Sequence, residues 1–204
     1  MSSETATSKG ERTRQAVITA AHQLFVEKGF AGTSMRDISE RAGLALGGIY
    51  NHFPTKESIF SEVLIAKHPF NQVFPLLVAA PGESVEEFVP SAAKSMLAEL
   101  GRRPDFLKLM FVELVEFEGR NLPKMFQFVY PQVLPLVERF RSRKGELRDI
   151  DALTLFRAFL GLFFSFYMTE FLLAGLPVIT QASHTLDSFV EIFLHGILAP
   201  KEAA

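Results

Sequence analysis

A pair of short helical patterns joined by a glycine, at residues 34–53, constrains the fold of this chain more than any other feature. The first pattern begins at Ser34, whose hydroxyl can cap a helix, and Asp37 three residues later completes a capping box. Gly43 ends this helix after about two turns, and a further short helix is expected from about Leu46. Two short helices joined by a turn of about three residues that contains glycine are typical of a helix-turn-helix.

Helical periodicity extends over the rest of the chain. Before the pair, residues 11–28 carry apolar side chains at steps of three and four, namely Val17, Ala21, Leu24 and Phe25. After Thr55 we expect a connecting helix interrupted near Pro69 and Pro75, and then helices at about 83–101, 104–118, 122–143, 151–174 and 183–198. No strand pattern competes with these helices, so the sequence predicts an all-α fold.

Composition limits the class of protein. With 204 residues, 48% of them apolar, the chain can bury the core of one or two domains. It has no cysteine, so disulfides and thiolate metal sites are excluded, and we expect no metal and no cofactor. Residues 1–9 are polar, which predicts a disordered tail and no signal peptide.

One apolar stretch, Leu153 to Leu176, could be mistaken for a membrane helix. Only twelve uncharged residues lie between Arg157 and Glu170, whereas a membrane-spanning helix needs about twenty. We therefore interpret it as a buried bundle helix, and expect a cytoplasmic protein without a membrane contact.

The helix-turn-helix segment is similar to a known family. Residues 33–44 read Thr-Ser-Met-Arg-Asp-Ile-Ser-Glu-Arg-Ala-Gly-Leu, and residues 47–57 read Gly-Gly-Ile-Tyr-Asn-His-Phe-Pro-Thr-Lys-Glu. Together they closely resemble the tetracycline-repressor (TetR) family of transcriptional regulators. The resemblance covers about a quarter of the chain. It implies a helix-turn-helix DNA-binding domain at residues 10–55 and a helical effector-binding and dimerisation domain at 56–204.

The resemblance implies a reader of double-stranded DNA that places its third helix in the major groove. Phosphate contacts are expected from Thr33, Ser34, Arg36 and Lys56. The groove-facing residues are expected to be Ala45, Leu46, Gly47, Gly48, Tyr50 and Asn51. Asn51 can pair with adenine, and Ala45 or Leu46 can pack on a thymine methyl. His52 is a further candidate, although packing at the helix end is the favoured interpretation, and Tyr50 could serve packing alone.

The sequence departs from the family pattern at the start of the third helix. Ala45 stands where a Ser or Thr cap is usual, and Leu46 where a polar or basic residue is common. Residues 1–60 carry seven Lys and Arg against six acids, so they form no strongly basic field. We therefore expect a DNA-binding domain that recognises its site through the shape of the DNA, through contacts with thymine methyl groups and through contacts with phosphates. Arg41 is interpreted as a solvated charge, and Arg12 and Arg14 either as a DNA-binding arm or as solvated charges.

The last two helices predict a homodimer. Apolar residues recur at helical spacing in the final pattern, and two such helices from each copy suit a four-helix interface, which is also where the family dimerises. The residues expected in this interface are Phe164, Phe171, Leu186, Phe189, Val190, Phe193, Leu194 and Ile197.

Phenylalanine is the compositional outlier, with 21 residues and no tryptophan. Most of these rings should pack in the core and the dimer interface, but the resemblance implies that some line a site for an apolar effector. The candidates are Met96, Phe106, Met110, Glu113, Leu114, Phe117, Asn121, Phe163, Phe166, Tyr167 and Glu170. For Glu113 and Glu170 a structural ion pair with Arg120 or Arg157 is the favoured alternative.

Other classes of function are poorly supported. The five histidines form no His-x-x-x-His or Glu-x-x-His pair, and no phosphate-binding loop or nucleophile elbow is present, so we do not expect an enzyme. The prediction is a homodimeric, ligand-responsive regulator, most often a repressor, on an inverted-repeat operator. The alternatives are a helical protein-interaction module and a regulator with an activator role.

Overall fold

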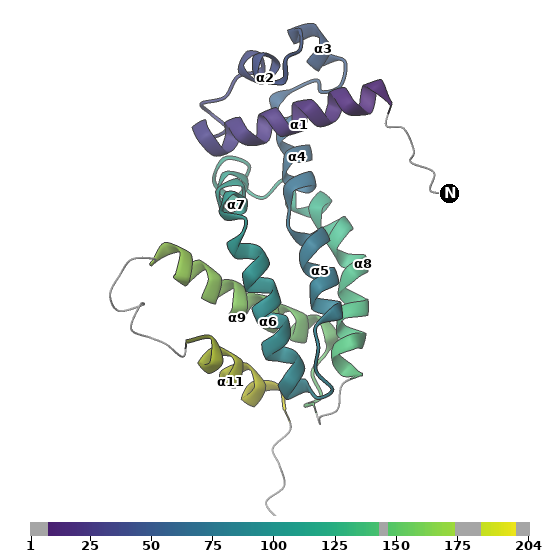
Figure 1. The fold of residues 1–204 in the computed structure, drawn as a ribbon, viewed down its shortest axis with the longest axis vertical. Helices are drawn as coiled ribbons and strands as arrows, with labels where there is room; N and C mark the ends of the chain where they lie inside the picture. Colours follow the sequence, from purple (N-terminus) through teal and green to yellow (C-terminus); the bar gives the residue numbers. More distant parts are fainter. Residues whose placement is uncertain (1–7, 143–146, 174–184, 199–204) are drawn as a thin grey trace, which may run out of the picture. The chain divides into compact units, whose positions relative to one another are not determined.

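The computed structural model describes residues 8–142, 147–173 and 185–198. Within these ranges the regular structure is helical, apart from one isolated antiparallel bridge between Leu147 and Leu198 (Figure 1). The prediction of an all-α fold is confirmed. The helices are α1 Lys9–Lys28, α2 Met35–Ala42, α3 Leu46–Tyr50, α4 Lys56–Lys67, α5 Phe70–Ala79, α6 Val85–Gly101, α7 Pro104–Glu116, α8 Leu122–Arg141, α9 Ala152–Leu172 and α11 Thr185–Ile197. Most of the expected tail, residues 1–9, lies outside the described residues.

The connecting segment is broken at one proline and not at the other. His68 precedes Pro69 and adopts an extended conformation (ψ 134°), because the proline ring disfavours helical geometry in the residue before it. This ends α4. The second expected interruption, near Pro75, is wrong, since Pro75 lies inside α5. The cost there is the backbone N–H that proline lacks, and Val73, Phe74 and Leu77 hold the helix by burying their side chains.

The chain forms two compact units. The first contains residues 1–68 and 104–126, and therefore holds α1 to α4, α7 and the first residues of α8. The second contains α5, α6, the remainder of α8, α9 and α11. α4 and α7 both pack with α1. The expected functional division, residues 10–55 for DNA binding and 56–204 for effector binding and dimerisation, stays a prediction.

The core of the first unit is built on aromatic rings. Phe60 stacks on Phe117 with the ring centroids 4.6 Å apart, and Phe30 lies edge-on to Phe117 at 4.7 Å. Phe25 contacts both Phe30 and Phe60 at 5.5 Å. This cluster, Phe25, Phe30, Phe60 and Phe117, joins the end of α1, the loop after it, α4 and the residue that follows α7.

The core of the second unit contains part of the expected dimer interface. Phe193 on α11 is 5% exposed, and its ring lies 5.7 Å from Phe159 and 5.8 Å from Phe163. Val190 and Ile197 are also buried, so these three residues pack inside the protomer, and their assignment to a dimer interface is corrected. The buried apolar side chains of α11 pack against α6 and α9 of the same chain. Of the other expected interface residues, Phe171 is exposed and the remainder are half-buried, namely Phe164, Leu186, Phe189 and Leu194.

Candidate nucleic-acid interface

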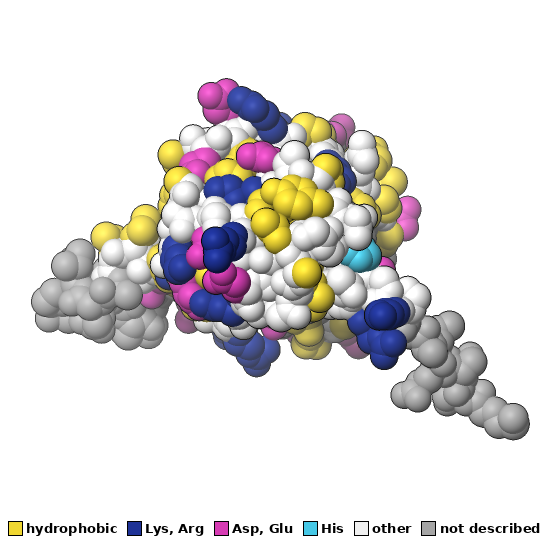
Figure 2. All heavy atoms as spheres, turned by 90° about the horizontal axis from the view of Figure 1, so that it is seen from above, with side chains coloured by type: hydrophobic (Ala, Val, Ile, Leu, Met, Phe, Trp, Pro, Cys, Tyr) yellow, Lys and Arg dark blue, Asp and Glu magenta, His cyan; other side chains and the backbone are white. Residues whose placement is uncertain are grey.

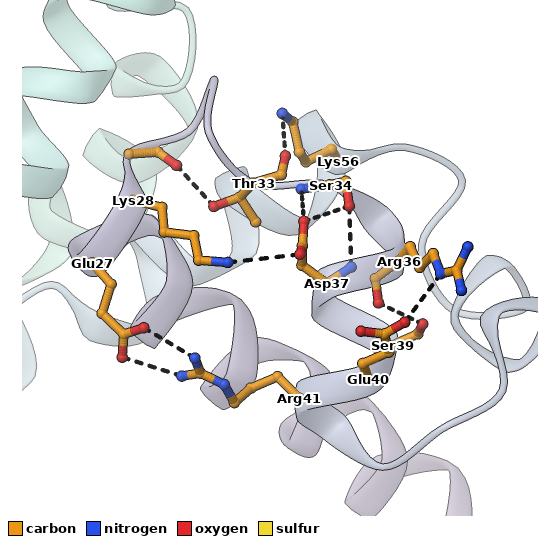
Figure 3. Close-up of polar contacts among 11 residues, drawn as sticks. Glu27, Lys28, Thr33, Ser34, Arg36, Asp37, Ser39, Glu40, Arg41 and Lys56 are labelled. Atoms are coloured by element: carbon orange, nitrogen blue, oxygen red, sulfur yellow. Dashed lines mark hydrogen bonds and ion pairs between the residues drawn. The ribbon is translucent and has the colours of Figure 1, made fainter.

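α2 is defined at both ends by the residues that the sequence indicated. Ser34 Oγ accepts a hydrogen bond from Asp37 N (3.1 Å), and Asp37 Oδ2 accepts one from Ser34 N (2.8 Å), which completes the capping box (Figure 3). The hydroxyl and then the backbone N–H of Ser34 lower the pKa of Asp37. At the other end Gly43 has φ 67°, a left-handed conformation that a residue with a Cβ adopts at a cost. The turn into α3 therefore depends on this glycine.

α3 is short and is held by packing more than by its own sequence. Its N-cap, Ala45, makes no side-chain hydrogen bond, and the helix contains Gly47 and Gly48, which lower its intrinsic propensity. Ile49 is fully buried and Phe53 is 2% exposed, and these two side chains anchor the helix to the unit.

The opposite face of α3 is open. Leu46 is 40% exposed and Tyr50 50%, with Ala45, Gly47 and Asn51 also exposed. Gly48 and His52 are half-buried. Figure 2, which looks down on Figure 1 from above, shows hydrophobic side chains exposed on this face, with Lys and Arg side chains and Asp and Glu side chains beside them. These are the residues predicted to face the groove, and they share one surface.

The cations around α2 differ in how freely they can reach a ligand. Arg36 is 81% exposed in its side chain and pairs with Glu40 one turn along, at 3.0 Å. Arg41, interpreted from sequence as a solvated charge, instead makes two hydrogen bonds to Glu27 of α1, at 3.1 and 3.0 Å (Figure 3). Arg14 pairs with Glu62 of α4, whereas Arg12 is exposed. Arg36 and Arg12 are therefore the cations most available to phosphate, while Arg14 and Arg41 join helices.

Thr33 and Lys56, both predicted to hold phosphates, are engaged inside the protein. Thr33 is 2% exposed and its hydroxyl donates to Gly29 O at 2.8 Å. Lys56 Nζ donates to the carbonyl oxygens of Phe30 (2.7 Å) and Thr33 (2.6 Å). In the DNA-free protein both side chains fasten the loop between α1 and α2. The buried Thr33 hydroxyl is not open to a phosphate, whereas a phosphate contact of the half-buried Lys56 stays a prediction.

The residues predicted to line an effector site divide between the two units. In the first unit, Glu113 is fully buried and its two carboxylate oxygens accept from Asn121 N (2.7 Å) and Asn121 Nδ2 (2.8 Å). The partner of Glu113 is thus Asn121 and not Arg120, and the pair holds the turn between α7 and α8. Phe117 belongs to the aromatic cluster. Of the rest in this unit, Phe106 is buried, Met110 half-buried and Leu114 exposed.

In the second unit the remaining candidates also serve packing. Met96 and Phe163 are buried in the core, and the Tyr167 hydroxyl donates to Leu100 O at 3.1 Å. Phe166 contacts Phe189, and Glu170 is half-buried. None of these residues lines the apolar cavity that this unit does contain.

That cavity lies among four helices of the second unit and has a volume of about 20 Å³, enough for roughly one water molecule. Its walls are entirely apolar: Leu77, Phe88, Ala92, Leu136, Val137, Phe140, Leu155, Phe156 and Phe159. The sequence did not reveal this set, because its members come from α5, α6, α8 and α9 and no local motif connects them.

Comparisons with known proteins find similarity to regulators with a helix-turn-helix in the segment that contains α2 and α3. The family model described as "Bacterial regulatory proteins, tetR family" matches residues 17–63, which span most of α1 through most of α4. The HTH-type transcriptional regulator YvkB of Bacillus subtilis is 25% identical over 197 residues, covering 92% of this chain and 98% of that protein. Over residues 17–63 the chain is therefore similar to regulatory proteins of the TetR family. An HTH-type transcriptional repressor from Rhodococcus jostii is 40% identical, over 30% of this chain and 29% of its own length.

Solved structures of TetR-family proteins share the fold. A Mesorhizobium loti protein assigned as a TetR-family transcriptional regulator has a TM-score of 0.72 at 22% identity, covering 94% of this chain and 100% of its own. NalD of Pseudomonas aeruginosa, the secondary repressor of the MexAB-OprM multidrug efflux pump, has a TM-score of 0.60 at 19% identity, covering 96% and 100%. These likenesses, both under 25% identity, show that the chain has the same fold as these proteins.

Proposed function

We propose that this protein is a repressor of the TetR family, homodimeric and cytoplasmic. It would bind an inverted-repeat operator and release it when an apolar small molecule binds the second unit. The observation that carries the DNA-binding part is the geometry of α2 and α3. A capped helix, a left-handed glycine and a buried pair, Ile49 and Phe53, present the open face of α3 for a major groove. Asn51 can pair with adenine there, and Leu46 and Ala45 can contact thymine methyl groups.

Exposed apolar residues on the last two helices support the homodimer. Residues 153–172 of α9 have a mean hydropathy of 1.4, and by length and composition this stretch could cross a membrane, yet only 28% of its apolar window is buried within the protomer. Leu172 is 62% exposed and Ile192 on α11 is 63% exposed. A second copy would cover these side chains and remove their apolar surface from water.

The apolar cavity supports an effector that is itself largely apolar. Its walls offer neither a charge nor a hydrogen-bonding side chain, so affinity would come from apolar area removed from water, about 25 cal/mol per Å². At about 20 Å³ the cavity must open to admit an acyl chain, an aromatic acid or a lipophilic drug. An effector that binds the opened state better would shift the protein toward that state.

DNA binding can be tested with two matched substitutions. Leu46→Glu puts a carboxylate on the groove-facing surface, whereas Val115→Glu changes another apolar residue, 76% exposed, on α7, which packs on α1 and α4. Fluorescence anisotropy with a duplex of about 30 base pairs should show salt-dependent binding for wild type and Val115→Glu and none for Leu46→Glu. A helical protein-interaction module, the alternative function, would show no such binding for wild type.

A further inference from the structure

Lys56, the first residue of α4, extends its side chain back to the loop between α1 and α2. Its Nζ lies 2.7 Å from Phe30 O and 2.6 Å from Thr33 O, and 4.1 Å from the centre of the Phe30 ring. Figure 3 shows the lysine directed at Thr33, next to the first turn of α2. The ammonium group therefore lies against two carbonyl groups and one ring that all belong to this loop.

These contacts use the hydrogen-bonding capacity of the ammonium group. A lysine has three N–H donors and no acceptor. Two of the three go to carbonyl oxygens in short charge-assisted bonds, and the face of the Phe30 ring attracts the remaining positive charge. A phosphate oxygen would therefore compete with three existing partners for a half-buried ammonium group that has one N–H donor left.

The loop that Lys56 holds sets where α2 begins. Thr33 N donates to Phe30 O (3.2 Å), the Thr33 hydroxyl donates to Gly29 O (2.8 Å), and Ser34 is the N-cap of α2. Phe30 is fixed in turn by the other three rings of the aromatic cluster. The free N–H groups at a helix N-terminus can bind an anion. Because this loop leads into α2, its position determines where the N–H groups of α2 lie relative to a DNA phosphate.

We propose that Lys56 is a positioning residue for DNA binding, which fixes the α1–α2 loop and thereby the N-terminus of α2, and does not itself neutralise a phosphate. This rests on the proposed DNA-binding function. Arg36 provides the contrast, because its side chain is 81% exposed and its pairing with Glu40 lies one turn along the same helix.

The salt dependence of DNA binding separates a positioning residue from one that neutralises a phosphate. Lys56→Met keeps the aliphatic stem and removes the charge and the donors. With a random-sequence duplex of about 30 base pairs, we expect its affinity to fall about tenfold at every salt concentration, with the slope of log K against log salt unchanged. Arg36→Met should instead flatten that slope by about 0.9 for each phosphate that the protein no longer neutralises. A flatter slope for Lys56→Met would overturn the proposal.

A measurement on the wild-type protein keeps the proposal testable if Lys56→Met does not fold. Acetylation of lysines, followed by mass spectrometry, should be slow at Lys56 and fast at Lys28, whose side chain is 48% exposed. Duplex DNA should leave the rate at Lys56 unchanged. A fast rate at Lys56 that DNA suppresses would contradict the proposal. If the wild type does not bind duplex DNA in a salt-dependent manner, the proposed function fails, and the inference fails with it.

Discussion

His68 is a buried histidine at the end of α4. Its side chain lies against Phe106, with the ring centroids 4.6 Å apart and the planes nearly perpendicular. Burial lowers the pKa of His68 to about 3, because the charged imidazolium loses its hydration there. The unfolded chain takes up this proton near the ordinary value of 6.5. As the pH falls, the unfolded state therefore binds the proton first, and stability is lost between about pH 6.5 and pH 3.

Replacing His68 by phenylalanine should remove this sensitivity to acid while keeping a ring against Phe106. Other groups also titrate in acid, so the informative quantity is the difference between variant and wild type. On going from pH 7 to about pH 4.5, wild type should lose about 3 kcal/mol more free energy of unfolding than His68→Phe. Urea denaturation at both pH values measures this, with His195→Phe, at an exposed position on α11, as the control. Equal losses in wild type and His68→Phe would show that His68 is protonated in the folded state.

Among the helices of the candidate DNA-binding surface, α3 has the sequence that favours a helix least. It has five residues, two of them glycine, and its N-cap position is occupied by Ala45 in an extended conformation (φ −67°, ψ 142°) without a capping side chain. A Ser or Thr at an N-cap position adopts the same backbone geometry. The N-cap of α3 therefore lacks only the side-chain hydroxyl that would accept a hydrogen bond.

Ala45→Ser should therefore stabilise the protein by about 1 kcal/mol, since the serine hydroxyl can accept from a free N–H in the first turn of α3. Chemical denaturation gives the change in the free energy of unfolding. Ala66→Ser, at an exposed position inside α4, provides the matched control and should lower stability by a few tenths of a kcal/mol. The explanation is wrong if both serines change stability alike.

How well the sequence predicted each feature depends on the distance along the chain over which its contacts act. The capping box of Ser34 and Asp37 and the turn at Gly43 act within a few residues, and the sequence predicted them correctly. Lys56 donates to carbonyl groups 23 and 26 residues away, and the sequence motif that indicated a phosphate contact gave no sign of these internal contacts. Phe193 shows the same limit, because helical periodicity identifies an apolar face but not the element that covers it.

At the scale of the whole molecule, two adjacent residues of α11 have opposite environments. Ile192 is 63% exposed, and Phe193 is 5% exposed among the rings of Phe140, Phe159 and Phe163. A carboxylate at Ile192 is compatible with the folded protomer but not with an apolar dimer interface, whereas one at Phe193 would be buried without a partner.

Ile192→Glu should accordingly give a folded monomer, and Phe193→Glu should give unfolded or insoluble protein. Light scattering coupled to size exclusion measures the mass, and circular dichroism measures the helix content. A folded Ile192→Glu protein that remains dimeric would place the interface elsewhere, and a monomeric wild type would exclude the dimer.

The measurement that tests the central claim most directly is selection of DNA from a random duplex pool by the wild-type protein, followed by sequencing. A two-fold dimer with α3 of each copy in a major groove predicts an inverted repeat with half-site centres about 34–36 Å apart, or a related spacing if two dimers bind. Asn51→Ala should recover the same repeat with a relaxed preference at one base pair in each half-site. Enrichment of a single asymmetric site, or no enrichment above the starting pool, would contradict the account.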